Sequence, residues 1–128
     1  MTGPELTMIL RELLADLVGT YTDPDLGPAA TRPAVSYGEL PASTVATGLE
    51  AHVDDVPELE SAPGYRHELE LERAWTVYLV EHDGTPPGRL QSAAERVVAA
   101  FRTSSPSRVP GDERLGIRNQ ILVTVTDR

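Results

Sequence analysis

The sequence predicts an α+β fold in a single domain, residues 1–128, with two helices on one face of an antiparallel or mixed sheet of about four strands. Two segments have apolar residues at three- and four-residue steps, which is typical of amphipathic helices. Three other segments alternate apolar and polar residues, which is typical of half-exposed strands. Together with one short extended segment they give the order α-β-β-β-α-β.

The first helix is predicted over residues 4–18, where leucines and one isoleucine repeat at helical spacing. Thr2 and Glu5 have the spacing of a capping box at its start. Gly19 suits a left-handed residue that ends the helix. Residues 21–33 follow with three prolines and one glycine, a composition that favours turns.

The strands are predicted at residues 34–37, 47–56 and 66–80. In 47–56, Leu49, Ala51 and Val53 alternate with polar residues, as expected of a half-exposed strand. Residues 66–80 form a much longer segment that would extend about 50 Å. Because strands typically have about five or six residues, we expect part of this long strand to protrude beyond the core, as one arm of a hairpin with residues 47–56. The turn-like residues 58–64 lie between the two arms.

The second helix is predicted after residues 82–88, a turn in which Thr85 could cap the helix and Pro86 could occupy its first position. Its apolar stripe consists of Leu90, Ala93, Ala94, Val97, Val98 and Phe101. A polar loop is expected at 104–113 and the last strand at 117–125.

Composition excludes several kinds of chemistry. The chain has no cysteine and no lysine, so thiolate catalysis, disulfides and Schiff-base chemistry are absent. A net charge of -9 disfavours a nucleic-acid or anionic-membrane surface, and no apolar run is long enough to cross a bilayer. The acidity belongs to residues 1–64, which hold 11 acids and 2 arginines, whereas residues 65–128 hold 9 of each. If the two halves meet between subunits, their charges favour head-to-tail association.

Candidate reactive residues are few. Imidazole and carboxylate suit zinc or iron, but the spacing of His52, His67 and His82 is not a recognised ligand pattern. His52 is expected on the polar side of its strand, His67 on the opposite parity of the next, and His82 in a turn, so we expect solvated or interface histidines. Acid pairs such as Glu68 with Glu70 could act as general acid and base, yet nothing supplies an apolar pocket for them. The sequence predicts no catalytic, cofactor-binding or metal-binding residues, hence no enzyme.

Six segments carry a family resemblance: LTMILRELLADLVGTYT, PAVSY, GLEAHV, ELELERAWTVYLVEHDG, LQSAAERVVAAF and ILVTV. In their order and style they resemble the tail terminator family, small neck proteins of long-tailed bacteriophages that are also similar to minor tail proteins of prophages. The resemblance implies a six-fold homo-oligomeric ring that caps the tail tube, ends its polymerisation and offers a surface for joining the head. It also implies a hairpin that reaches a neighbouring subunit or tube ring.

The resemblance further implies partners and a location. The partners are other copies of the chain, the tail tube protein and a head-completion or connector protein, while DNA passes through without specific binding. The protein would lie in the neck of the virion after assembly in the host cytoplasm. The candidate interface or lumen residues are Glu50, His52, Asp54, Glu68, Glu70, Glu72 and Arg73.

Two alternatives stay open at this point. One is a head-completion or adaptor neck protein, which would bind the portal in place of the tail tube. The other is a small regulatory or ligand-binding module of a bacterial host, which would purify with its ligand.

Overall fold

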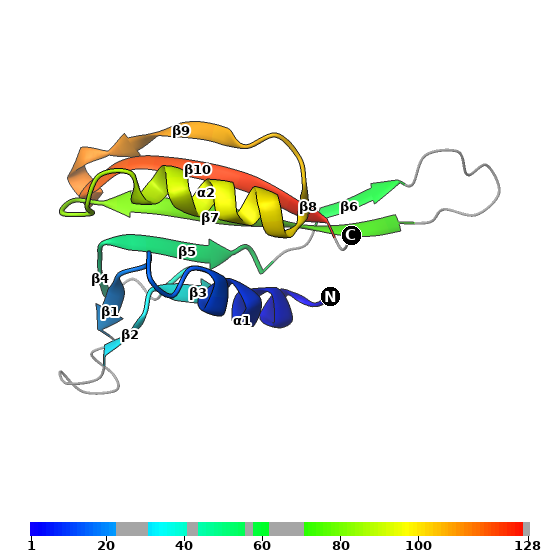
Figure 1. Cartoon of the computed structure of the whole chain (residues 1–128), viewed down its shortest axis with the longest axis horizontal. Coiled ribbons are helices and arrows are strands. Elements are labelled where there is room, and N and C mark those ends of the chain that lie inside the picture. The colour runs from blue at the N-terminus through cyan, green and yellow to red at the C-terminus, as the bar shows by residue number, and fades with distance from the viewer. Residues whose placement is uncertain (23–30, 41–43, 56–57, 62–70, 127–128) are drawn as a thin grey trace.

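The computed structural model describes residues 1–22, 31–40, 44–55, 58–61 and 71–126. These residues have an α+β fold, as the sequence predicts, with two α-helices and two β-sheets (Figure 1). None of the described helices is both long and apolar enough to cross a bilayer.

The larger sheet is mixed and has more strands than the four expected. Its main path runs β3 (Val35–Tyr37), β5 (Leu49–Val53), β7 (Leu71–His82), β10 (Ile117–Thr126) and β8 (Arg102–Thr103). Off this path, β6 (Glu58–Ser61) pairs with β7 and β9 (Ser107–Asp112) pairs with β10. The β3–β5 pair is parallel and the other pairs are antiparallel.

Both helices cover the same face of this sheet, as predicted. Helix α1 (Gly3–Leu13) lies over β3 and β5, and α2 (Arg89–Ala100) lies over β7, β8 and β10 (Figure 1). The predicted strand parity is confirmed for nine described residues that are buried in one cluster with the helices: Leu49, Ala51, Val53, Trp75, Val77, Leu79, Ile121, Val123 and Val125. Ile117, expected on the same inward side, is only partly buried, because the ladder has an irregularity just after it. The largest fully buried side chains are Leu6, Leu10, Leu14, Leu49, Leu79, Val35, Val53, Val77, Val97, Val123 and Val125.

The start of α1 is as predicted, but its end is not. The backbone N–H of Glu5 donates to Oγ1 of Thr2 at 3.2 Å. The helix ends at Leu13, with Leu14 as its C-cap, several residues before the predicted end at 18. Gly19 has no left-handed backbone; instead, a Cβ there would collide with the carbonyl oxygen of Thr47. The glycine is needed for this close approach of two chain segments.

A second, smaller sheet occupies segments that were expected to be turns. It consists of β1 (Thr20–Thr22), β2 (Thr31–Pro33) and β4 (Val45–Thr47), in the antiparallel order β2-β1-β4. The predicted strand 47–56 is therefore two strands in different sheets. They are separated at Gly48, whose φ of 82° is the left-handed conformation that glycine adopts without steric cost.

The long strand is present but has a different range and an additional partner. It ends at His82 instead of residue 80, and residues 62–70 lie outside the described part of the chain. Strand β5 pairs with β7 as far as Val77, and β10 pairs with β7 as far as Ala74. Beyond Ala74, β7 pairs with β6, in the segment expected to be a turn. This two-stranded extension lies beyond the helices in Figure 1, so a protruding arm exists, but it is formed with residues 58–61 and not with 47–56.

Three expectations about the second half of the chain were wrong. Thr85 does not cap α2; its hydroxyl donates to the carbonyl of His82 at 2.7 Å, and Gly88 is the N-cap. The expected loop at 104–113 contains β9. Proline is tolerated in an edge strand, where not every N–H needs a ladder partner, and Pro110 lies in such a strand beside β10. Val98, expected in the apolar stripe, is 42% exposed.

Candidate functional site

The candidate site lies on the face of the larger sheet that the helices leave uncovered. Because strand residues alternate between faces, Glu50 and His52 of β5 point away from the core formed by Leu49, Ala51 and Val53. His82 is on the same outer face, at the end of β7.

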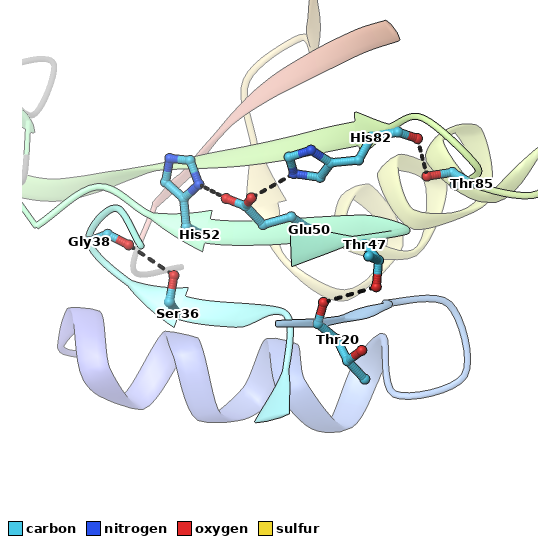
Figure 2. A network of polar contacts seen from close by, with 8 residues as sticks. All are labelled: Thr20, Ser36, Gly38, Thr47, Glu50, His52, His82 and Thr85. Atoms are coloured by element: carbon cyan, nitrogen blue, oxygen red, sulfur yellow. Dashed lines mark hydrogen bonds and ion pairs between the residues drawn. The ribbon is translucent and has the colours of Figure 1, made fainter. Parts of the chain in front are cut away.

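Glu50 is bound between two histidines on this face. Its Oε2 lies 2.8 Å from Nδ1 of His52, and its Oε1 lies 2.8 Å from Nε2 of His82. Figure 2 shows the carboxylate between the two rings, one from its own strand and one from β7. All three side chains are 16% exposed or less.

The backbone explains how His82 reaches Glu50. In the β5–β7 ladder, Glu50 is opposite Val80 and His52 is opposite Tyr78. The N–H of His82 donates to the carbonyl of Gly48 at 3.2 Å. Gly48 has no side chain, so the imidazole of His82 can lean along the strand to the diagonal position over Glu50, a contact that antiparallel pairs allow for long side chains.

This arrangement keeps Glu50 ionised over a wide pH range. Burial alone raises the pKa of Glu50, but the hydrogen bonds and the positive charge of His52 and His82 outweigh it and lower the pKa from 4.5 to about 2. The ionised carboxylate accepts one N–H from each ring, which fixes the orientation of both imidazoles.

An aromatic contact continues the cluster along the sheet. The rings of His52 and Tyr78 are stacked, with centroids 4.7 Å apart and an interplanar angle of 13°. Since they are direct cross-strand neighbours, the pair forms a flat aromatic surface beside the carboxylate.

A hollow of about 720 Å³ lies over this cluster. Its floor includes the outer-face residues of β5, β7 and β10. One rim follows β3 and β5 and is acidic, while the opposite rim contains Leu115, which is 68% exposed. The lining residues are Glu39, Leu40, Glu50, His52, Asp54, Asp55, Tyr78, Val80, Leu115, Ile117 and Gln120.

A second group of polar side chains surrounds Glu81, the residue before His82 at the end of β7. Nδ2 of Asn119 donates to Oε1 of Glu81 at 3.1 Å, and Nε of Arg118 lies 3.8 Å from the same oxygen. Arg118 stands at an irregularity in the β7–β10 ladder and also donates to the carbonyl of Thr85. These contacts hold the turn after β7, and hence the position of His82.

The structure brings together some of the predicted residues and separates others. Glu50, His52 and Asp54 line the hollow together. Glu68 and Glu70 lie outside the described residues, as does His67. Glu72 and Arg73 lie in the part of β7 that pairs with β6, where Glu72 is opposite Glu60. Glu72 was expected on the strand segment beside Glu50, His52 and Asp54. This placement is wrong, because β5 pairs with residues 77–81 of β7.

The sequence did not predict the role of His82. It was expected in a turn, apart from the other histidines, and both His52 and His82 were expected at solvated or interface positions. In fact they converge on one carboxylate and are largely buried within the single chain. The sequence does contain one signal for this contact. If the predicted strand 66–80 is extended by two residues, His82 falls on the same outward side as Tyr78 and Val80.

The cluster has a limited chemical repertoire. Both oxygens of Glu50 already accept hydrogen bonds, so this carboxylate is not presented as a free nucleophile or general base. In the described part of the chain, no three histidine or acidic side chains are grouped so as to hold a metal ion. What the hollow offers is a negatively charged concave surface with an aromatic patch.

No family model, curated protein or solved structure matches this chain.

Proposed function

We propose that this chain is a structural phage protein that forms a ring on the end of the tail tube, ends tube polymerisation and provides the surface for joining the head. In this proposal six copies form the ring, it lies in the neck of the virion, and it has no catalytic role. The resemblance to tail terminators supplies the specific activity.

The observation that carries the proposal is the two-stranded arm. Residues 71–73 of β7 lie beyond the ends of β5 and β10 and have β6 as their strand partner among the described residues. A ribbon of this kind, outside the layer that α1 and α2 cover, is suited to reaching a neighbouring subunit (Figure 1). An isolated two-stranded ribbon is marginally stable in water, so contact with another subunit would stabilise it.

The charge distribution is consistent with this role. The first half of the chain has a net charge of -9, whereas the second half holds nine arginines balanced by nine acids, so arginines of one copy can pair with acidic residues of the next. Acidic walls also suit a channel for DNA, because basic walls would bind the phosphates through release of counterions.

Tube length is the direct test. Purified tail tube protein from the same genome is polymerised with and without this chain. We expect short, uniform tubes with extra density at one end when the chain is present. Tubes of unchanged length without end density would contradict capping.

A control separates the arm from the rest of the fold. A variant in which residues 58–73 are replaced by a short Gly-Ser turn should lose capping, whereas Val98→Ser, an exposed change on α2, should retain it. Unchanged capping by the arm-deleted variant, with its fold retained by circular dichroism, would contradict the role given to the arm. Binding to the portal instead of the tube would favour a head-completion or adaptor protein.

The hollow over Glu50 favours one other function, a ligand-binding module for a small cation. Its volume of about 720 Å³ and its acidic rim are compatible with an amine or guanidinium compound. Calorimetry with arginine and with spermidine tests this: micromolar binding by a chain that stays monomeric would favour the module over the ring.

A further inference from the structure

The uncovered face of the larger sheet is shaped to receive a group from outside the chain. One face is covered by α1 and α2. The other face carries the hollow, and Leu115 of the short 3-10 helix Glu113–Leu115 lines it with a largely exposed side chain. Antiparallel sheets can leave one face to water. Here, however, that face is concave, with apolar side chains such as Val80 and Ile117 beside the acidic ones.

The chemistry of the hollow favours a guanidinium group. The carboxylates of Glu39, Asp54 and Asp55 line one rim, and the stacked rings of His52 and Tyr78 lie on the floor. A guanidinium is planar, donates two parallel N–H bonds to a carboxylate and stacks on aromatic rings, and it is less strongly hydrated than an ammonium group. No arginine is among the residues that line the hollow.

The chain itself presents such a group on a different surface. Arg32 is the central residue of β2, and all three residues of this strand are exposed. Strand β2 forms an edge of the smaller sheet, where a row of backbone groups is available for contact with another chain. All 11 cationic residues are arginines, so a contact between copies that uses a positive side chain has to use arginine.

Several of the other described arginines already make contacts within the chain. Arg96 contacts Asp16 and the carbonyl of Leu13. Arg89 donates to the carbonyl of Leu17, and Arg118 binds the turn at Thr85. Among the described side chains none is paired with Arg32.

We propose that the β2 edge of one copy docks on the uncovered sheet face of the next, with Arg32 entering the hollow beside Asp55 and Glu39. The contact joins two different surfaces, so it is head-to-tail and can close into a ring. This inference rests on the proposed ring and names the contact that would hold it together.

A charge-exchange experiment tests the contact. The variants are Arg32→Glu, Asp55→Arg and the double variant, with Arg108→Glu as a matched control because it makes the same charge change at an exposed residue of β9. Sedimentation velocity measures assembly, and circular dichroism confirms that each variant folds. We expect each single variant to weaken assembly at least about 10-fold, which corresponds to 1.4 kcal/mol, and the double variant to recover most of it.

The outcomes separate this inference from the proposed function. A wild-type ring that is unaffected by Arg32→Glu, or single variants that fail without recovery in the double variant, would overturn the contact and leave the ring intact. A wild-type chain that stays a monomer or stops at a symmetric dimer, with and without tail tube protein, would overturn both.

Discussion

His82 donates from Nε2 to Oε1 of Glu50 across 2.8 Å, although 32 residues separate them in the chain. Together with the contact from His52 to the other carboxylate oxygen, this bond fixes the register of β5 against β7 on the uncovered face. A slip of β5 by one residue would move Glu50 and His52 to the face opposite His82 and break this bond. The side chains beneath the hollow therefore keep their positions only while the two central strands keep this pairing.

Substitution of Glu50 should destabilise the protein. Glu50→Gln retains one acceptor oxygen and replaces the other with an NH2 group that faces an imidazole N–H. Because a buried donor is left unpaired, we expect the free energy of unfolding to fall by about 1–3 kcal/mol. Urea denaturation at pH 7 measures this. Glu12→Gln on the exposed side of α1 is the control and should change stability by less than about 0.5 kcal/mol. Equal effects of the two substitutions would contradict the role of Glu50.

Stability should also depend on pH through Glu50. The pKa of Glu50 in the folded chain is about 2, below the ordinary value of 4.5, so the ionised form stabilises the fold above pH 4.5. This contribution is lost as the pH falls from 4.5 towards 2 and amounts to about 3 kcal/mol. Urea denaturation between pH 6 and 3 should show a steeper loss for the wild type than for Glu50→Gln. Parallel pH profiles would contradict the assignment.

Close approach of two segments at Gly19 predicts a strong effect of a single methyl group. Gly19→Ala places a Cβ against the backbone of Thr47, which has no flexible end to move, so we expect a loss of about 3 kcal/mol or more. Gly84→Ala is the control: its Cβ meets nothing within 4 Å, and only the positive φ of 88° is penalised, by about 1 kcal/mol. Thermal denaturation compares them. A smaller loss at Gly19 than at Gly84 would contradict the packing described.

Two residues on α1 test which side of the helix faces the sheet. Leu10 is fully buried and Met8 is 63% exposed. Leu10→Ala should cost about 2–5 kcal/mol through lost burial and a cavity. Met8→Ala should change stability by no more than about 0.5 kcal/mol, unless an assembled ring covers it. Both are measured by denaturation at a concentration at which the chain is monomeric, and a reversed order would contradict the helix orientation.

The fold class and the strand faces were predictable because they depend on local periodicity. Leu49, Ala51 and Val53 face the core as their alternation indicates, and Thr2 caps α1 as its position suggests. The end of α1 was not predictable, since Gly19 serves a contact with Thr47 that is distant in sequence.

The additional strands and the site depend on pairing, which one sequence does not reveal. Strand β9 contains Pro110 and Gly111, which normally argue against a strand, and it exists because β10 offers it an edge position. The contact of Glu50 with His82 depends on a diagonal register and on the missing side chain of Gly48. Neither is visible in the alternation of apolar residues.

The proposal that copies of this chain join into a ring is tested most directly by native mass spectrometry of the purified protein, alone and with tail tube protein. We expect a closed assembly at about six times the 13.8 kDa mass of the chain, present at micromolar concentration or formed on addition of the tube protein. A single species at 13.8 kDa under both conditions would contradict it.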